Sequence, residues 1–239
     1  MKVKDQVLLK IKLENIFKKD INKIFSLIVK EYRNSIKYNN NNNFNVSDYK
    51  QLIRFVLEKH YKRVHKKFRN IDNKFTKQDV EEYAEQNINI LFSMWMIDRL
   101  DKVTDEIIET TIEDTNRSII KAQSQMEESN IPELAIAASL LLRRSFINRS
   151  KFIATVETQG AAESTKLIEK QSQEKVIKKR WITVGDSRVR DAHNRANGQE
   201  QLLNEPFKVG GELLMYPGDR SLGASIGNIA NCRCSQIFI

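Results

Sequence analysis

Apolar residues recur every three or four positions through most of the chain before Arg180, which is the spacing of side chains along one face of a helix. The clearest example runs from about Val7 to Lys37, where lysines fill the positions between the apolar ones. The apolar positions there are Ile21, Ile24, Phe25, Ile28, Tyr32 and Ile36. The pattern predicts a long amphipathic helix.

A polar segment, residues 39–45, interrupts this pattern with five consecutive asparagines. Such a run favours neither helix nor strand, so we interpret 39–45 as a flexible connector. Ser47 is then in place to cap a second helix. The apolar positions predicted for that helix are Leu52, Phe55, Val56, Val64 and Phe68. His60 and His65 are five positions apart, not the four that would place both on one face for a metal, and we interpret them as surface or partly packed residues.

Two more stretches of helical spacing follow. The most apolar part of the first, Ile88–Ile97, is interpreted as the centre of the helical core. Pro132 suits the first position of a further helix, and helical spacing then extends to about Lys179. Gly160 lies inside this region at a cost of up to about 1 kcal/mol relative to alanine, which indicates close packing or a kink.

The period changes near residue 180. Trp181–Val184 has the pattern of a short strand, Phe207–Tyr216 predicts a hairpin with a Gly-Gly pair in its middle, and Ser235–Ile239 predicts a last strand. The expected fold class is mainly α with a small α+β carboxy-terminal domain. Long amphipathic helices are followed by a turn-rich module of three or four short strands.

Charge is distributed in blocks along the 239 residues, beneath a formal net charge of +9. Residues 1–70 carry 18 Lys and Arg against 6 acids, residues 71–140 carry 6 against 15, and residues 141–239 carry 16 against 10. Solvated helix faces explain this pattern, and so does a basic amino-terminal arm that contacts nucleic acid. The acidic block has two candidate partners, a basic protein or the chain's own amino-terminal helices.

The sequence argues against several classes of protein. No apolar run approaches the roughly 20 residues that a membrane span needs, and charges interrupt the amino terminus too often for a signal peptide. Two cysteines in a C-x-C arrangement do not make a disulfide framework. A reducing cytoplasm, or a particle assembled there, is the simplest expected location.

Candidate chemistry gathers near the carboxy-terminal end. Cys232 and Cys234 are two positions apart, so on an extended segment they point to the same side, as two thiolate ligands of one ion would. His193 is a third candidate ligand. A fourth would be a water or one of the carboxylates Asp186, Asp191 and Asp219. Buried free thiols beside a hydrogen-bonded histidine, or a strained disulfide, are the alternatives.

Four charged residues crowd one turn, and two interpretations apply to them. The four are Asp186, Arg188, Arg190 and Asp191. They suit a salt-bridged network that fixes the loop. The catalytic alternative pairs His193 with Asp191, or with Cys232 as a nucleophile. No serine elbow, P-loop or His-x-x-x-His motif supports catalysis.

The order of these residues resembles the carboxy-terminal domain of the phage Mu F-like minor head proteins, also called the phage head morphogenesis family. The matching pieces are Trp181, Asp186-x-Arg188-x-Arg190-x-x-His193, Gly198, Pro217-Gly218-Asp219 and Asn231-Cys232-Arg233-Cys234. The segment before them is similar to the helix that leads into that domain, except that Val156 separates Thr155 from Glu157. The resemblance covers residues 145–239, which we take as the Mu F-like domain, after a helical amino-terminal region at 1–140.

The resemblance implies a protein of the virion and not an enzyme. It implies a minor head protein of a tailed phage, assembled in the host cytoplasm and located in the head near the portal. The implied partners are the portal protein, other head proteins and packaged double-stranded DNA. Two rivals stay open: a metal-dependent hydrolase or nuclease using His193 and the C-x-C pair, and a DNA-binding accessory protein without a portal role.

Roles for individual residues follow from this interpretation. The residues expected to hold the domain together are Trp181, Asp186, Arg188, Arg190, His193, Gly198, Asn231, Cys232 and Cys234. DNA contact is expected from the lysine-rich first helices or from Lys175, Lys178, Lys179 and Arg180. No cofactor is required, and a structural zinc ion held by His193, Cys232 and Cys234 stays an alternative.

Overall fold

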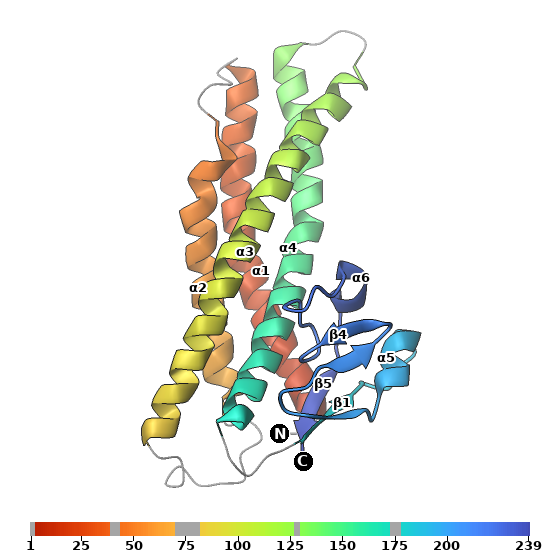
Figure 1. Ribbon diagram of the computed structural model, residues 1–239. Helices are drawn as coiled ribbons and strands as arrows, with labels where there is room; N and C mark the ends of the chain where they lie inside the picture. Colours follow the sequence, from red (N-terminus) through yellow and green to blue (C-terminus); the bar gives the residue numbers. More distant parts are fainter. Residues whose placement is uncertain (1–2, 39–43, 70–81, 127–129, 173–177) are drawn as a thin grey trace. The chain divides into compact units, whose positions relative to one another are not determined.

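The computed structural model describes residues 3–38, 44–69, 82–126, 130–172 and 178–239 (Figure 1). The first helical elements in chain order are α1 (Val3–Lys37), the 3-10 helix η2 (Val46–Tyr49), α2 (Lys50–Phe68), α3 (Glu82–Gln123) and α4 (Ile131–Gln171). The module that follows them contains β1 (Lys178–Ile182), α5 (Asp191–Ala196), β2 (Glu200–Leu202), β3 (Phe207–Val209), β4 (Glu212–Leu214), α6 (Ile226–Ile229) and β5 (Ser235–Phe238). The expected fold class, mainly α with a small carboxy-terminal module of strands, is confirmed. Residues 39–43 of the predicted connector lie outside the described residues.

The chain forms two compact units, and each contains parts of all four long helices. Unit 1 consists of Met1–Asn15, His60–Met96 and Ala154–Ile239, and unit 2 of Ile16–Lys59 and Ile97–Ile153. The carboxy-terminal module therefore belongs to unit 1 together with the beginning of α1. The division expected between residues 140 and 145 falls inside α4.

Apolar faces of the helices form the core of unit 2, and polar contacts also join these helices. The rings of Phe25 and Phe146 stack with their centroids 4.2 Å apart, and the hydroxyl of Tyr32 donates a hydrogen bond to the carbonyl of Thr115 at 2.8 Å. Lys50 on α2 pairs with Asp105 on α3 at 2.6 Å. Arg54 pairs with Asp101 between the same helices. In unit 2 the acidic block of the sequence thus meets basic residues of the chain itself.

The sequence prediction for α2 was wrong in three details. Asn45 provides the amino-terminal cap, because its side chain accepts a hydrogen bond from the backbone N–H of Ser47, which lies inside η2. Leu52 and Phe55 are 41% and 60% exposed, since the buried face is built from other positions. That face consists of Ile53, Leu57, Tyr61, Val64 and Phe68. His60 is completely buried on it, whereas a surface or partly packed position was expected.

The apolar centre predicted in α3 is buried on one side only. Ile88 and Phe92 are 3% exposed, but Ile90 and Met94 are 56% and 63% exposed. A run of nearly continuous apolar residues hides which face meets the core, because helical periodicity is lost within it. The prediction for α4 was also too long at its end: the helix ends at Gln171, before Lys179.

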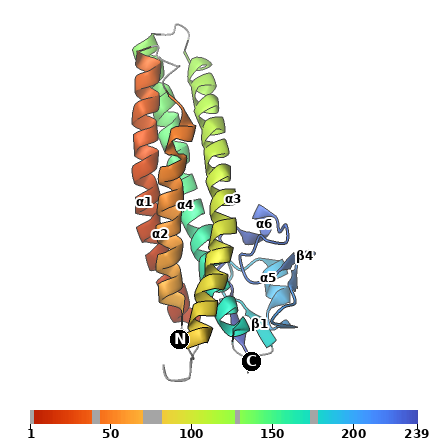
Figure 2. The ribbon, with the colours of Figure 1, turned by 60° about the vertical axis from the view of Figure 1, so that its left-hand side comes forward.

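The part of α4 inside unit 1 is buried around its whole circumference. Glu163 lies there with no exposed surface and accepts hydrogen bonds from the ammonium groups of Lys10 on α1 at 2.6 Å and Lys166 at 2.9 Å. It also accepts from the hydroxyl of Ser235 at 2.8 Å and from the backbone N–H of Gln236 at 3.1 Å. A buried carboxylate is tolerated only with such partners, so this network fixes the last strand against α4 and the start of α1. The beginning of α1 and the carboxy-terminal strand accordingly lie near each other in both views (Figures 1 and 2).

The module contains two small antiparallel sheets. The first has the order β2-β1-β5, and Trp181 on β1 is paired with Gln236 on β5. The second is the predicted hairpin of β3 and β4. Its turn residues Gly210 and Gly211 have φ values of 60° and 84°, which glycine adopts without steric cost. The predicted last strand is confirmed, but β1 begins earlier than Trp181, at Lys178, and the strands number five within the described residues rather than three or four.

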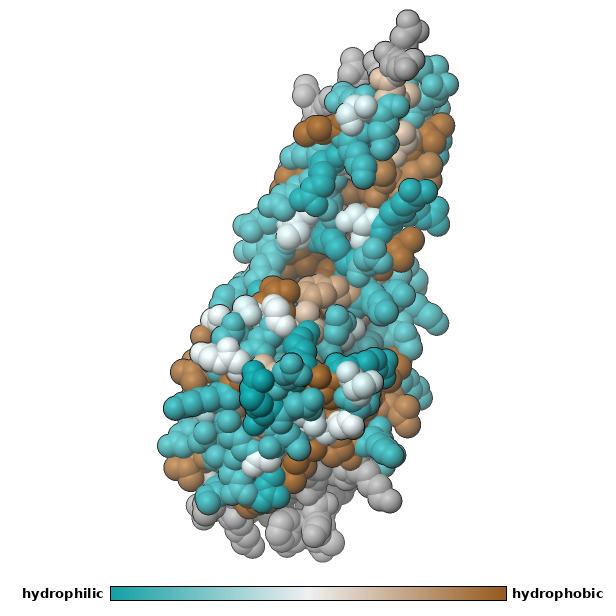
Figure 3. Space-filling view, turned by 90° about the vertical axis from the view of Figure 1, so that its right-hand side faces the viewer, coloured by the Kyte–Doolittle hydropathy of each residue, from teal (hydrophilic) through white to brown (hydrophobic). Residues whose placement is uncertain are grey.

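The face drawn in Figure 3 is mainly hydrophilic, with hydrophobic residues in separate groups. Within the described ranges, no helix combines the length and the apolar character needed to cross a membrane.

Candidate functional site

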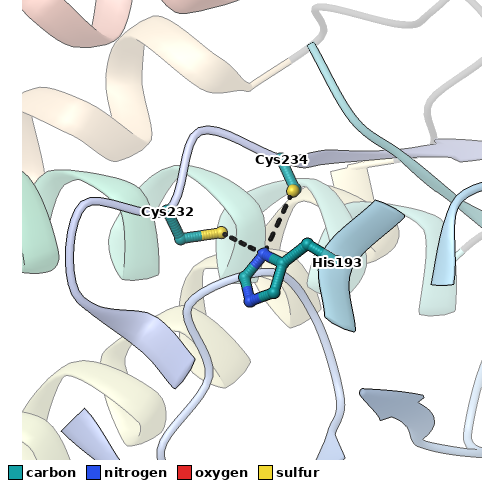
Figure 4. A group of neighbouring side chains, drawn as sticks. All are labelled: His193, Cys232 and Cys234. Atoms are coloured by element: carbon teal, nitrogen blue, oxygen red, sulfur yellow. Dashed lines mark hydrogen bonds between the residues drawn. The ribbon is translucent and has the colours of Figure 1, made fainter. Parts of the chain in front are cut away.

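His193, Cys232 and Cys234 come together as one buried group, which we call the His–Cys cluster. Nδ1 of His193 lies 3.3 Å from Sγ of Cys234 and 3.7 Å from Sγ of Cys232 (Figure 4). The ring nitrogen and the two sulfurs all lie within 4.8 Å of one another. The exposed fractions are 2%, 4% and 1%, so the cluster is shielded from bulk solvent. The grouping expected from the sequence is therefore present in the structure.

Local backbone geometry places the three side chains. His193 lies on the short helix α5, and the guanidinium of Arg190 just before that helix donates a hydrogen bond to the carbonyl of Ala230. Cys232 and Cys234 lie on the extended segment that enters β5. Asn231 precedes them with a φ of 53°, a left-handed conformation that asparagine tolerates better than most residues. This turn points both thiols at the same imidazole nitrogen (Figure 4).

The orientation of the His193 ring is fixed by Asn228. The amide Nδ2 of Asn228 donates to the carbonyl of Val209 at 2.9 Å and to Oε2 of Glu212 at 3.0 Å. Its Oδ1 must therefore face Nε2 of His193, which lies 2.8 Å away, and the backbone carbonyl of Asn228 lies 2.9 Å from the same nitrogen. Because both neighbours are acceptors, Nε2 carries a proton and Nδ1 is the nitrogen directed at the cysteines. Sequence reasoning did not identify this role of Asn228.

Hydrogen bonding within the cluster shifts the pKa values of the two thiols in opposite directions. The hydrogen bond from Cys234 is the main reason that the pKa of Cys232 is lowered to about 5, against the effect of burial. The same bond and burial raise the pKa of Cys234. Burial alone would lower the pKa of His193, but its contacts with Cys232 and Asn228 outweigh this and raise the pKa. Without a metal, the favoured form is a Cys232 thiolate between the Cys234 thiol and a protonated His193.

The charged turn forms a salt-bridged network, but its residues are not the ones expected from the sequence. Asp186 accepts two hydrogen bonds of 2.7 Å from the guanidinium of Arg233, and further bonds from the backbone and side chain of Arg188. These bonds, chiefly those from Arg233, hold the pKa of Asp186 well below its ordinary value. Arg190 binds a backbone carbonyl instead, and Asp191 is exposed at the start of α5. Arg233 was overlooked as a partner although it stands inside the Asn-Cys-Arg-Cys motif.

Trp181 packs against the cluster, and Gly198 is hydrogen-bonded to Trp181. Trp181 is completely buried, and its ring packs edge-on against His193 and Phe207, with centroids 5.6 Å and 5.4 Å away. Gly198 has a φ of 82° and donates its backbone N–H to the carbonyl of Trp181 at 2.8 Å. The indole N–H of Trp181 has the thiol of Cys234 as its side-chain partner.

The carboxylates considered as a fourth ligand are engaged elsewhere or distant. Asp219 accepts from the backbone N–H groups of Met215 and Ser221 and from the Ser221 hydroxyl, so it stabilises its own turn. Asp186 is held by arginines, and among the described residues no carboxylate joins the three ligand atoms. A surface pocket does reach the cluster. Beside the three cluster residues it is lined by Val184, Arg188, Val189, Arg190, Asn231 and Arg233.

The basic residues near β1 are mostly unavailable for DNA. Lys179 is completely buried, and its ammonium donates to the carbonyl of Met215 at 2.7 Å, so the expectation that it contacts DNA is wrong. Burial also lowers its pKa to about 8. Lys178 and Arg180 lie on the strand, not on a helix, and both pair with Glu200. Lys175 lies outside the described residues.

A more continuous basic surface lies on α1 in unit 2. It consists of the exposed residues Lys19, Lys23, Lys30, Arg33 and Lys37, which we call the α1 stripe. At 3.6 residues per turn, these positions fall within an arc of about 80° on one helix face. None of the five has an ion-pair partner in the part of the chain that the structure describes. The sequence suggested DNA contact by the first helices, but not which face.

Comparison with known proteins supports the family resemblance that the motif residues indicated. The family described as phage Mu protein F like protein matches residues 102–237, more than half of the chain. The match begins before the region in which the motif residues were recognised and includes about half of α3. No significant match to a curated protein or to a solved structure was found. The chain belongs to the phage Mu protein F-like family, a family of phage head morphogenesis proteins.

Proposed function

We propose that this head protein acts at the portal vertex as a minor component and contacts packaged DNA through the α1 stripe. Family membership supports an association with the virion and with other head proteins. The observation that carries the DNA contact is the stripe itself, a row of exposed cations without acidic partners in the described residues.

The length of the stripe suits a nucleic-acid backbone. Lys19 and Lys37 are 18 positions apart on a continuous helix, which corresponds to about 27 Å, or the rise of about eight base pairs. Regularly spaced cations along such a length neutralise several phosphates and release their counterions. Contacts of this kind do not read sequence, which suits a protein that meets whatever DNA the head contains.

Salt dependence tests the DNA contact. The stripe variant combines Lys19→Gln, Lys23→Gln, Lys30→Gln and Lys37→Gln, and duplex binding is measured by fluorescence anisotropy over a salt series. If each lysine contacts one phosphate, the slope of log affinity against log salt falls by about 3.6. Glutamine keeps the helix propensity of lysine, so α1 stays folded.

A matched control removes the same charge from other exposed positions of unit 2. It combines Lys102→Gln, Lys121→Gln, Arg143→Gln and Lys151→Gln, all of which are exposed. The control is expected to keep the slope of the unchanged protein. Equal changes in both variants would show that net charge, and not the stripe, governs binding.

Portal association is tested separately. Co-expression with the portal protein of the same phage, followed by purification through a tag on the portal, is expected to recover the chain at a fixed ratio. Recovery of portal alone, together with intact salt-sensitive DNA binding, would favour an accessory DNA-binding protein and reject the portal role.

The hydrolase alternative receives little support from the cluster. A cysteine nucleophile must meet its substrate, yet Cys232 and Cys234 are 4% and 1% exposed and both thiols face the same ring nitrogen. The geometry is better suited to holding the module together.

A further inference from the structure

We propose that His193, Cys232 and Cys234 bind one zinc ion, with a fourth position directed toward the adjoining pocket. The proposal is independent of the DNA contact and of the portal role. It rests on the orientation of the ligands, their separations, their combined charge and the surroundings of the sulfur atoms.

The first argument is the orientation of the imidazole. Asn228 occupies Nε2 of His193, so Nδ1 is the one ring nitrogen available to a cation, and it lies between the two sulfurs. Amide donation to Val209 and Glu212 keeps Asn228 in this orientation. A hydrogen-bond acceptor behind the non-ligating nitrogen is what metal-bound histidines in proteins ordinarily have.

The second argument is distance. A tetrahedral zinc with Zn–N of about 2.0 Å and Zn–S of about 2.3 Å places nitrogen and sulfur about 3.5 Å apart. The two separations in the structure, 3.3 Å and 3.7 Å, lie on either side of that value. A small adjustment of the three side chains would therefore bring them around one ion.

The third argument is charge and ligand type. Two thiolates balance the charge of Zn²⁺, so a neutral complex forms in a buried place where a lone ion would be costly. On binding, the Cys234 thiol and Nδ1 of His193 each release a proton to solvent, and the two thiolate sulfurs and the neutral Nδ1 donate lone pairs to the metal. Thiolate with imidazole is a ligand set that favours zinc over magnesium or calcium.

The fourth argument concerns the buried indole N–H of Trp181. Its side-chain partner is the thiol of Cys234. A zinc-bound thiolate keeps negative charge on its sulfur and would be a stronger acceptor for this donor than a neutral thiol. Since no described carboxylate reaches the cluster, the fourth ligand is a water in the pocket lined by Arg188, Arg190 and Arg233.

Elemental analysis of the full-length purified protein is the first test, with a result of one zinc per chain expected. The double variant Cys232→Ser, Cys234→Ser is expected to lose the zinc. Arg195→Ala is the control, because it removes an exposed arginine of α5 that neither lines the pocket nor serves as a ligand. Zinc retained equally in the double variant would identify a surface-bound ion and overturn the proposal.

Cobalt substitution tests the geometry in the unchanged chain, so it does not depend on whether a variant folds. Zinc is removed with a chelator and the protein is titrated with Co²⁺. Thiolate-to-cobalt charge-transfer bands and the visible bands of tetrahedral Co²⁺ are expected to saturate at one equivalent. Spectra of octahedral Co²⁺, or an intact mass showing that the two cysteines have lost their hydrogens to a disulfide, would reject the site.

Discussion

Asn228 holds the ring of His193 by accepting from Nε2 at 2.8 Å, and it does so with an amide whose other end is fixed by two further acceptors. The two residues lie 35 positions apart, on α6 and α5. The direction in which the imidazole presents Nδ1 to the cysteines therefore depends on Asn228, a residue outside the His–Cys cluster.

Replacing Asn228 with alanine is expected to destabilise unit 1. The change removes the Oδ1 acceptor of His193 Nε2, which keeps the backbone carbonyl of residue 228, and it removes the amide donor to the carbonyl of Val209. The expected cost is about 2 kcal/mol in the free energy of unfolding. Urea denaturation followed by tryptophan fluorescence measures this cost. Asn194→Ala, at an exposed position of α5, is the control and should change stability by less than about 0.5 kcal/mol. Similar losses in both variants would contradict a special role for Asn228.

Replacing Glu163 with glutamine is expected to cost about 3–5 kcal/mol, since it removes the buried carboxylate that pairs with the ammonium groups of Lys10 and Lys166. Burial raises the pKa of Glu163, but the two lysines outweigh it and hold the pKa below its ordinary value. The carboxylate therefore stabilises the protein at neutral pH, and this stabilisation is lost as the pH falls below the ordinary glutamate pKa.

The acid sensitivity of unfolding checks the same residue. Stability measured from pH 7 downward should fall less steeply below pH of about 4.5 in Glu163→Gln than in the unchanged protein. The variant Glu85→Gln removes the ion pair between Glu85 and Arg69. The side chain of Glu85 is 54% exposed, so little effect on stability is expected from this variant. If Glu85→Gln lost much stability and Glu163→Gln lost none, the acid sensitivity of unfolding could not be assigned to Glu163.

His60 is expected to make folding sensitive to mild acid. Burial lowers its pKa to about 3, while the unfolded chain takes up the proton near pH 6.5. Because the folded pKa is the lower one, protonation favours the unfolded state, and stability falls as the pH drops below 6.5. The contribution between pH 6.5 and 5 is about 2 kcal/mol.

The variant His60→Gln keeps a polar partner for the Thr158 hydroxyl, which lies 2.9 Å from Nε2, and removes the titration. Its unfolding free energy should vary less between pH 7 and 5 than that of the unchanged chain. His65→Gln is the companion variant, since burial lowers the pKa of His65 to about 4 and predicts an effect of the same sign. Unchanged pH dependence in His60→Gln would disprove the assignment.

Gly218 and Gly211 form a matched pair for a test of close packing. Both have positive φ, 89° and 84°, so alanine is strained at either position by about 1 kcal/mol. A Cβ on Gly218 would also lie 2.8 Å from Cγ of Gln159, whereas nothing lies within 4 Å at Gly211. Gly218→Ala should therefore lose about 1–3 kcal/mol more than Gly211→Ala in denaturation experiments. Equal losses would show that the contact with α4 is not tight.

Much of the module followed from local chemistry. The Gly210-Gly211 pair specifies a tight turn wherever the chain folds, and two cysteines at C-x-C spacing face the same side of any extended segment. His193 was recognised as their partner because it was the one histidine within the motif. These predictions needed no knowledge of distant contacts.

Other features depend on partners that are far away in the sequence. The exposure of Leu52 and Phe55 follows from which face of α2 meets the core, and apolar character alone does not decide this. Lys179 resembles a surface cation in sequence, yet on β1 it points inward to the carbonyl of Met215, 36 positions away. Glu163 looked like an ordinary charged helix residue until its partner Lys10, 153 positions away, was in place.

The buried network around Glu163 also has a consequence for synthesis. Gln6 and Ser235 share a hydrogen bond across 229 positions, and both belong to unit 1. At about 5–20 residues per second, a ribosome makes the second about 10–50 s after the first. During that interval Lys10 and the start of α1 have emerged without the strand that covers them. Unit 1 is thus completed only after translation of β5, and a partner that binds the nascent chain can act before the unit closes.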